Sequence, residues 1–221
     1  MTEFIRARSP EQKEQRMEEI KAAADALFRT VPYNGITLST IAEQLSWTRA
    51  NLYRYVSTKE EIYLQIAEDV MRDYHEALLS AVPTGCGYTP ETLADVWAGI
   101  LNAHQDYLRY ASMLASIIET NVSLERLARF KGEYVRLMES FSDRLVELLG
   151  VSREAAQLIQ QSVLFHGSGM VGFCSASPMV HQAMEMAGVS IYRPEFKEEM
   201  RDFILMNLRH RHRRLALQAA S

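Results

Sequence analysis

Apolar residues recur every three or four positions through most of the chain, which is the spacing of one face of an α-helix. The strict alternation that marks half-buried strands is scarce, and no strand–helix–strand rhythm is visible. The sequence therefore predicts an all-α protein. The expected helices cover about residues 10–31, 38–45, 49–55, 57–81, 90–109, 110–121, 124–149, 152–174 and 195–215, and residues 175–194 are the least regular segment of the second half.

Composition sets broad limits on the class of protein. The chain has 221 residues, of which 48% are hydrophobic, so it can bury a sizeable core. Cys86 and Cys174 lie far apart, in no pattern typical of a disulfide framework or a zinc site. No apolar run is long enough to cross a bilayer, and residues 1–14 lack the apolar stretch of a secretory signal. We therefore expect a cytoplasmic protein without a membrane partner.

The charges are unevenly distributed. Residues 1–59 carry nine Lys and Arg against seven Asp and Glu, whereas residues 60–221 carry fifteen against twenty-one. Phosphate groups would be repelled by an acidic body, so any contact with nucleic acid is expected at the N-terminal end. A surplus of this size is weak evidence by itself.

The first quarter of the chain predicts a helix-turn-helix. Turn-forming residues 32–35 end the first long helix, and Thr37 is placed to cap a short second helix. Ser46 and Trp47 make a tight break, and Thr48 is placed to cap a short third helix. In such a unit the second of the two short helices enters the major groove of DNA.

The residue types of the third helix suit that task. Arg49 can donate two hydrogen bonds to a guanine edge, Asn51 can pair with adenine, and Ala50 allows close approach. Thr48 offers a hydroxyl beside free backbone N–H groups, where a phosphate can bind. Further contacts, mainly to the DNA backbone, are expected from Tyr53, Arg54, Tyr55 and Lys59.

A structural interpretation stays open for each of these residues. Tyr53 and Tyr55 can be core aromatics, and Thr37 and Thr48 can be helix caps only. The combination favours DNA binding, because the face is polar, carries Arg and lacks the apolar stripe of a packed helix. The DNA-binding interpretation stands if Arg49 is free of intramolecular partners and its face is open in a dimer.

A resemblance to the DNA-binding signature of the tetracycline-repressor family lies between Thr37 and Ile62, in the stretch TLSTIAEQLSWTRANLYRYVSTKEEI. The family pattern has a Thr before a short Ile-Ala helix, a Gly-Val-Ser turn, a Gly-Thr-Leu-Tyr helix, a Phe, and a Ser-Lys-Glu-Glu-Leu start to the next helix. The resemblance covers about residues 14–65. It implies phosphate contacts by Thr37, Thr48, Tyr53, Tyr55 and Lys59, and base contacts near Arg49, Ala50 and Asn51.

The chain departs from that pattern at three places. Ser46 and Trp47 replace Gly-Val at the turn, Ala50 and Asn51 replace Gly-Thr, and Val56 replaces Phe. Ser46 is therefore expected in a conformation that glycine adopts more readily. These changes affect the DNA sequence that is recognised more than the fold.

The resemblance also implies a division of labour. Residues 1–58 are expected to form the DNA-binding domain, and residues 59–221 a helical domain that binds a small-molecule effector and dimerises through the last two long helices. In the helix over 152–174 a seam suited to helix packing recurs at spacings of four and three, and consists of Ile159, Val163, His166, Met170 and Phe173. The family implies an operator-binding homodimer, usually a repressor.

Apolar and aromatic residues of the second half are candidates for an effector pocket, because such pockets have apolar walls with a few polar groups. The alternative for each of them is an ordinary place in the core. The candidates are Trp97, His104, Tyr107, Met113, Phe130, Tyr134, His166, Met170 and Phe173.

Other classes of function have less support. Gly167 to Gly172 matches the Gly-x-Gly-x-x-Gly pattern of dinucleotide sites, but a helix precedes it where such sites need a strand. We expect no enzyme activity, no cofactor and no metal site. The remaining alternative is a helical ligand-binding or scaffolding protein with a vestigial helix-turn-helix.

Overall fold

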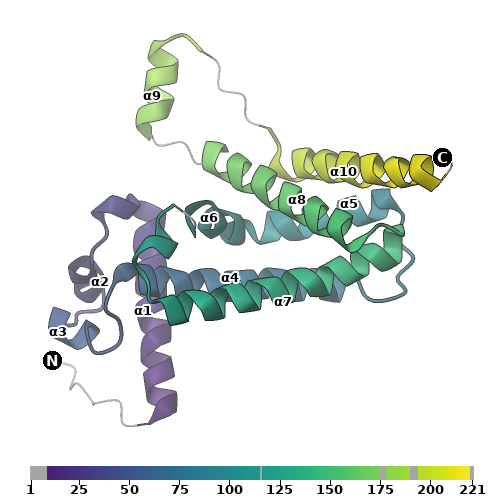
Figure 1. Cartoon of the computed structure of the whole chain (residues 1–221). Coiled ribbons are helices and arrows are strands. Elements are labelled where there is room, and N and C mark those ends of the chain that lie inside the picture. Colours follow the sequence, from purple (N-terminus) through teal and green to yellow (C-terminus); the bar gives the residue numbers. More distant parts are fainter. Residues whose placement is uncertain (1–8, 115, 175–177, 190–193, 220–221) are drawn as a thin grey trace. The chain divides into compact units, whose positions relative to one another are not determined.

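The structure is a computed structural model that describes residues 9–114, 116–174, 178–189 and 194–219 (Figure 1). Every regular element in these residues is helical, which confirms the predicted all-α class. The elements are α1 (Pro10–Thr30), η1 (Tyr33–Gly35), α2 (Leu38–Gln44), α3 (Arg49–Leu52), α4 (Lys59–Ala81), α5 (Pro90–Ala103), α6 (Gln105–Leu114), η2 (Ile118–Asn121), α7 (Leu124–Leu149), α8 (Arg153–Cys174), α9 (Pro178–Met186) and α10 (Phe196–Ala219).

The chain forms two compact units. The first contains residues up to Asp69 together with the segment 114–127, and the second contains residues 70–113 and the chain from Ala128 onward. Both α4 and α7 therefore contribute residues to each unit. The division of function at residue 58 stays a prediction.

The first unit is built on α1. Ser9 caps this helix through a capping box with Gln12, and Pro10 occupies the first helical position. Ile20 and Ala24 are buried completely, and the hydroxyl of Tyr63 in α4 donates to the carbonyl of Ala24 at 3.0 Å. The apolar stripe of α1 thus packs inside the unit, as its spacing predicts.

The second unit has a core of aromatic and apolar side chains. Trp97 of α5 is buried against Phe141 of α7, and its indole N–H donates to the hydroxyl of Tyr74 in α4 at 2.7 Å. Gly167 of α8 is needed for close packing, because a Cβ there would lie 3.0 Å from the side chain of Leu108.

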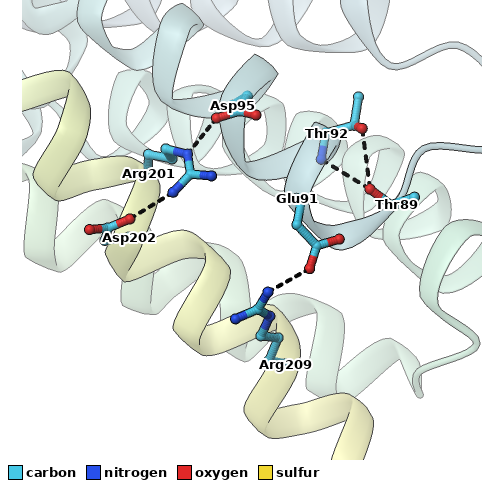
Figure 2. A network of polar contacts seen from close by, with 7 residues as sticks. All are labelled: Thr89, Glu91, Thr92, Asp95, Arg201, Asp202 and Arg209. Atoms are coloured by element: carbon cyan, nitrogen blue, oxygen red, sulfur yellow. Dashed lines mark hydrogen bonds and ion pairs between the residues drawn. The ribbon is translucent and has the colours of Figure 1, made fainter.

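Helix α10 lies along α5 in the second unit. Arg201 donates to Asp95 at 2.5 Å and Arg209 donates to Glu91 at 2.7 Å, and Figure 2 draws both contacts between the two helices. These ion pairs are solvent-exposed, so they orient α10 more than they stabilise it. The apolar contact comes from Ile204 and similar residues of α10, which are fully buried.

The structure corrects the predicted seam of α8. Ile159 and Val163 are buried inside their own chain, and the ring of His166 stacks on Phe203 of α10 at 3.8 Å. The side chain of Phe173 lies outside the described part of the structure. The spacing of these residues reflects packing within the protomer, so it does not mark the face left for a partner.

Two predicted helix boundaries are wrong. The break expected near residue 110 lies at His104, which ends α5 with its N–H donating to the carbonyl of Ile100. No Gly or Pro marks this break, and apolar residues continue at helical spacing on both sides. In the segment expected to be irregular, Pro178 begins α9 and Gly188, at φ 66°, follows its end. These residues delimit a helix there instead of preventing one.

The hydrogen bond between Trp97 and Tyr74 gives a test of this core. We expect Trp97→Phe to lower the free energy of unfolding by about 2–4 kcal/mol, because it leaves a cavity and an unpaired hydroxyl. Tyr74→Phe removes only the hydroxyl and should cost about 1–3 kcal/mol. Urea unfolding of both variants and of the double variant measures the coupling. The double variant should lose less than the sum of the two, and strict additivity would show that the bond contributes nothing.

Candidate nucleic-acid interface

The turn between α2 and α3 has the geometry of a helix C-terminal cap. Ser46 has φ 56°, and its N–H donates to the carbonyl of Glu43 at 2.9 Å. The N–H of Trp47 donates to the carbonyl of Ala42 at 2.8 Å. These two bonds define a Schellman motif, whose left-handed position is usually a glycine. The expectation that Ser46 adopts a glycine-like conformation is confirmed.

Helix α3 is a single turn, shorter than predicted. Thr48 caps it by accepting a hydrogen bond from the N–H of Asn51 at 3.2 Å, and Leu52 is completely buried. The residues from Tyr53 to Tyr55 continue as turns. One buried residue anchors the helix, which leaves the side chains of Arg49 and Ala50 exposed and that of Asn51 half-buried.

Arg49 and Tyr53 form a pair on this surface. Both residues are exposed, and the Nε and Nη2 of Arg49 donate to the Tyr53 hydroxyl at 3.2 and 2.7 Å. The condition that Arg49 is free of intramolecular partners is therefore not met within the protomer. The two residues lie one helical turn apart, which brings long side chains together. Because Tyr53 is 45% exposed, it is no core aromatic.

Thr37 and Thr48 both cap helices and are both exposed. Thr37 forms a capping box with Thr40, accepting from its N–H at 3.2 Å. The Thr48 hydroxyl accepts a hydrogen bond through its oxygen, so its own hydrogen remains a donor for another group, whereas the Thr37 hydroxyl already donates to that of Thr40 in a long bond of 3.5 Å. Capping and phosphate binding are thus compatible for Thr48, and for Thr37 when its hydrogen leaves the long bond to Thr40.

Asn51 is oriented less favourably for base pairing. Its Oδ1 is buried and has no hydrogen-bond partner among the described residues. Pairing with adenine needs both the amide oxygen and the amide nitrogen, so the side chain would have to turn. Ala50 and Arg54 are exposed on the same short segment.

Tyr55 is half-buried and belongs to a small aromatic cluster. Its ring lies 5.8 Å from that of Trp47, and the guanidinium of Arg16 lies 5.4 Å from the Trp47 ring. Trp47, which replaces a smaller residue of the family pattern, is thus accommodated between α1 and the turn after α3. The core interpretation fits Tyr55 better than Tyr53.

Lys59 is held inside the unit. Its ammonium donates to the carbonyls of Tyr33 and Ile36, each at 2.8 Å, and lies 3.9 Å from the centre of the Tyr33 ring. Burial lowers the pKa of Lys59, and the charge of Glu60 opposes this effect. Two of the three ammonium hydrogens are used, so a phosphate can take only the third.

The effector-pocket candidates lie in the second unit. Trp97, Tyr107 and Phe130 are buried, whereas His104, Met113, Tyr134, His166 and Met170 are half-buried. Three of them surround Tyr74, whose ring stacks on Tyr107 at 4.5 Å, lies 6.3 Å from His104 and meets the indole N–H of Trp97. The structure therefore groups these three with Tyr74 and leaves the role of all the candidates as a prediction.

Sequence reasoning missed two residues of this cluster, Tyr74 and His75. The buried His75 has its Nδ1 2.8 Å from the carbonyl of Met71, which makes Nδ1 the protonated nitrogen. Burial lowers the pKa of His75, and the hydrogen bond to Met71 and the charge of Glu133 oppose this effect. The spacing of Met71, Tyr74 and Leu78 on the inward face of α4 was the available signal.

Two other kinds of site are not found among the described residues. No group of three or more His, Cys, Asp or Glu side chains there is placed to hold a metal ion. No helix in the described ranges is long and apolar enough to cross a membrane.

Comparison with known proteins identifies the family. Residues 20–66 match the family described as bacterial regulatory proteins, tetR family, and residues 65–209 match the tetracyclin repressor-like C-terminal domain. The chain belongs to the tetracycline-repressor family. It is thus a DNA-binding transcriptional regulator with the C-terminal domain of a ligand-binding regulator.

Solved structures of the family share the fold at low sequence identity. A TetR/AcrR-family regulator from Thermobifida fusca is 16% identical, with a TM-score of 0.58 over 88% of this chain and 97% of that one. AmtR from Mycobacterium smegmatis is 18% identical, with a TM-score of 0.54 over 92% of this chain and 89% of AmtR. PfmR from Thermus thermophilus is 20% identical, with a TM-score of 0.56 over 88% of this chain and 95% of PfmR. No curated protein has significant sequence similarity to this chain.

The Schellman turn generates a prediction for this member of the tetracycline-repressor family. A non-glycine residue in the left-handed region costs about 1–2 kcal/mol, partly offset by the greater freedom of glycine in the unfolded chain. Ser46→Gly should therefore raise the free energy of unfolding by about 0.5–1 kcal/mol, measured by urea denaturation. Ser140→Gly, the same change inside α7, should lower it slightly. A destabilised Ser46→Gly variant would refute the account of the turn.

Proposed function

We propose that the exposed face around α3 is the surface that reads operator DNA, with the base contacts centred on Arg49. The observation that carries this proposal is a run of exposed residues in and around α3, a helix anchored by the buried Leu52. These residues are Thr48, Arg49, Ala50, Tyr53 and Arg54. A helix that is anchored on one side and exposed on the other can enter the major groove of DNA. A vestigial unit has no reason to keep a polar, cationic face.

The contacts are expected to divide by kind. Thr37, Thr48 and Arg54 are suited to phosphates, and Lys59 can add one ammonium hydrogen. Arg49 is suited to base edges, with Tyr53 supporting it and Ala50 allowing close approach. Asn51 contributes only if its amide turns outward, and Tyr55 acts by packing against Trp47.

Selection of bound sequences from a pool of random duplexes, with the full chain at stated salt, tests the proposal. Arg49→Ala should weaken binding to the selected duplex by about 1–3 kcal/mol and relax the base preference at one position of the site. Arg136→Ala, which removes an exposed arginine from α7 that bonds to Glu133, is the matched control and should leave DNA affinity unchanged. An unaltered sequence preference in Arg49→Ala would remove this residue from base recognition.

We also propose that a homodimer forms through the outer face of α8 together with α10. Ile159 and Val163 of the predicted seam are buried in the protomer, and among the residues whose burial is described, Leu158 and Phe165 on α8 and Met206 on α10 are large apolar residues left exposed. A Cβ added at Gly169 or Gly172 would have no described atom within 4 Å outside its own helix turn, so a partner helix can approach closely there. Asp202 and Arg209 line an open groove beside Met206.

The dimer face is tested at Phe165, which is 71% exposed. Phe165→Glu should leave the protomer folded and raise the dimer dissociation constant by about a hundredfold or more, because a buried aromatic anchor would be lost in both copies. Leu124→Glu, at an equally exposed residue of α7, is the control. Sedimentation equilibrium measures both. A dimer of unchanged affinity in Phe165→Glu would place the interface elsewhere.

The second unit is proposed to bind the small-molecule effector near Tyr74, Trp97 and Tyr107. The phenols and the neutral imidazole of His75 offer uncharged hydrogen-bonding groups on aromatic walls, which suit an apolar or aromatic effector. Binding there would change operator affinity by reciprocal coupling. Repression, a cytoplasmic location and the absence of enzyme activity belong to the same proposal.

A further inference from the structure

Glu60, in the first turn of α4, carries a buried carboxylate. The residue is 8% exposed, and burying a charge is unfavourable unless hydrogen bonds replace its water. Oε1 accepts from the hydroxyl of Tyr33 at 2.7 Å, and Oε2 accepts from Nδ2 of Asn121 at 3.1 Å. One carboxylate therefore joins two segments that lie on opposite sides of it in the sequence, and each oxygen depends on a different segment.

The Tyr33 end of this connection leads into the helix-turn-helix. Lys59, next to Glu60, holds the ring of Tyr33 by a cation–π contact and the carbonyls of Tyr33 and Ile36 by hydrogen bonds. Burial and the bond to Glu60 raise the pKa of Tyr33, so the phenol stays protonated and donates. Ile36 directly precedes Thr37, the cap of α2. The position of η1 and of the start of α2 thus depends on Lys59 and Glu60.

The Asn121 end leads into the segment between α6 and α7. Besides the bond to Glu60, the carbonyl of Asn121 accepts from the hydroxyl of Thr58 at 3.0 Å, and Arg126 lies 3.9 Å from Glu61. The segment 114–127 belongs to the first unit, although the chain that enters and leaves it belongs to the second. The segment is therefore joined by the chain at both of its ends to the second unit.

We propose that Asn121, Glu60 and Tyr33 form a relay through which the α6–α7 connection controls the position of the helix-turn-helix. If Asn121 withdraws, Oε2 of Glu60 is left buried without its hydrogen bond, so the carboxylate turns toward water and releases the hydroxyl of Tyr33. Residues from η1 to the start of α2 then lose one of their attachments to α4. As a regulatory device the relay rests on the proposed function, since it matters to an operator only if α3 binds DNA.

Amide hydrogen exchange of the full chain without DNA tests the coupling by itself. Asn121→Ala removes the amide from an exposed residue, so the chain should fold. Exchange in peptides covering residues 33–41 should become roughly tenfold faster, because a hydrogen bond to a charged group is lost. Peptides within residues 130–150 should be unchanged. Exchange that rises only around residues 118–124 would show that Asn121 has a local role and would overturn the relay.

Thr120→Ala is the matched control. It lies in the same 3-10 turn, and its hydroxyl donates only to the carbonyl of Ile117 at 2.7 Å among the described contacts. This variant should leave exchange in residues 33–41 unchanged. Equal acceleration in both variants would contradict the relay, since general loosening of η2 would then explain the effect.

A double variant tests the order of the three residues. In Tyr33→Phe the relay is already broken at its other end, so adding Asn121→Ala should change exchange in residues 36–41 less than about twofold. With the selected duplex, Asn121→Ala should weaken binding about three- to tenfold and Thr120→Ala should not. If no duplex is ever selected, the DNA-binding proposal fails while the exchange result still decides the coupling.

Discussion

A buried negative charge at the start of α4 organises the first unit. The carboxylate of Glu60 depends on its hydrogen bonds, because their loss would leave a charge that is mostly shielded from water. Lys59 places an ammonium beside it and binds two carbonyls of the chain that precedes α2. These opposite charges hold η1 against α4 by directional bonds, which fix position more sharply than apolar contact does. The attachment of α2 and α3 is mainly apolar, through residues such as Ile41 and Leu52.

This arrangement explains why the α3 face is free for another molecule. The helix is held by Leu52 behind it and by Trp47 in the turn, which packs between Arg16 and Tyr55. Thr48 contributes to stability as a cap and still has a hydroxyl hydrogen to donate. The choice between a structural and a DNA-binding role is thus a false one for the capping threonines, because one hydroxyl can serve both.

The sequence was informative wherever a local rule sets the structure. Helical spacing, caps at Thr37 and Thr48 and the glycine-like position of Ser46 depend on residues within one or two turns, so they were predicted. The break at His104 has no such local mark. The Arg49–Tyr53 pair could have been predicted from their i, i+4 spacing. It was not, because the DNA-binding interpretation was considered with Arg49 free of intramolecular partners. The stripe on α8 gave no way to tell a partner's face from the protomer's own core.

Contacts between distant residues were beyond the sequence. Nothing in the chain indicates that Asn121 reaches Glu60, which is 61 positions away, or that Tyr74 meets Trp97. Both pairings depend on how long helices pack, and many arrangements satisfy the same apolar pattern. Polar residues of this kind are easily taken for surface residues, so single-sequence reasoning misses the buried polar links that couple parts of a fold.

The geometry of the α3 face also bears on what it can recognise. Nε and Nη2 of Arg49 bond to the Tyr53 hydroxyl, so the guanidinium presents its outer edge, with Nη1 and the second hydrogen of Nη2. The Tyr53 hydroxyl accepts from Arg49 and keeps its hydrogen to donate. Because Oδ1 of Asn51 is buried, the described face offers mostly donors. Donors match the O6 and N7 acceptors of guanine in the major groove, so we expect the proposed α3 surface to prefer guanine.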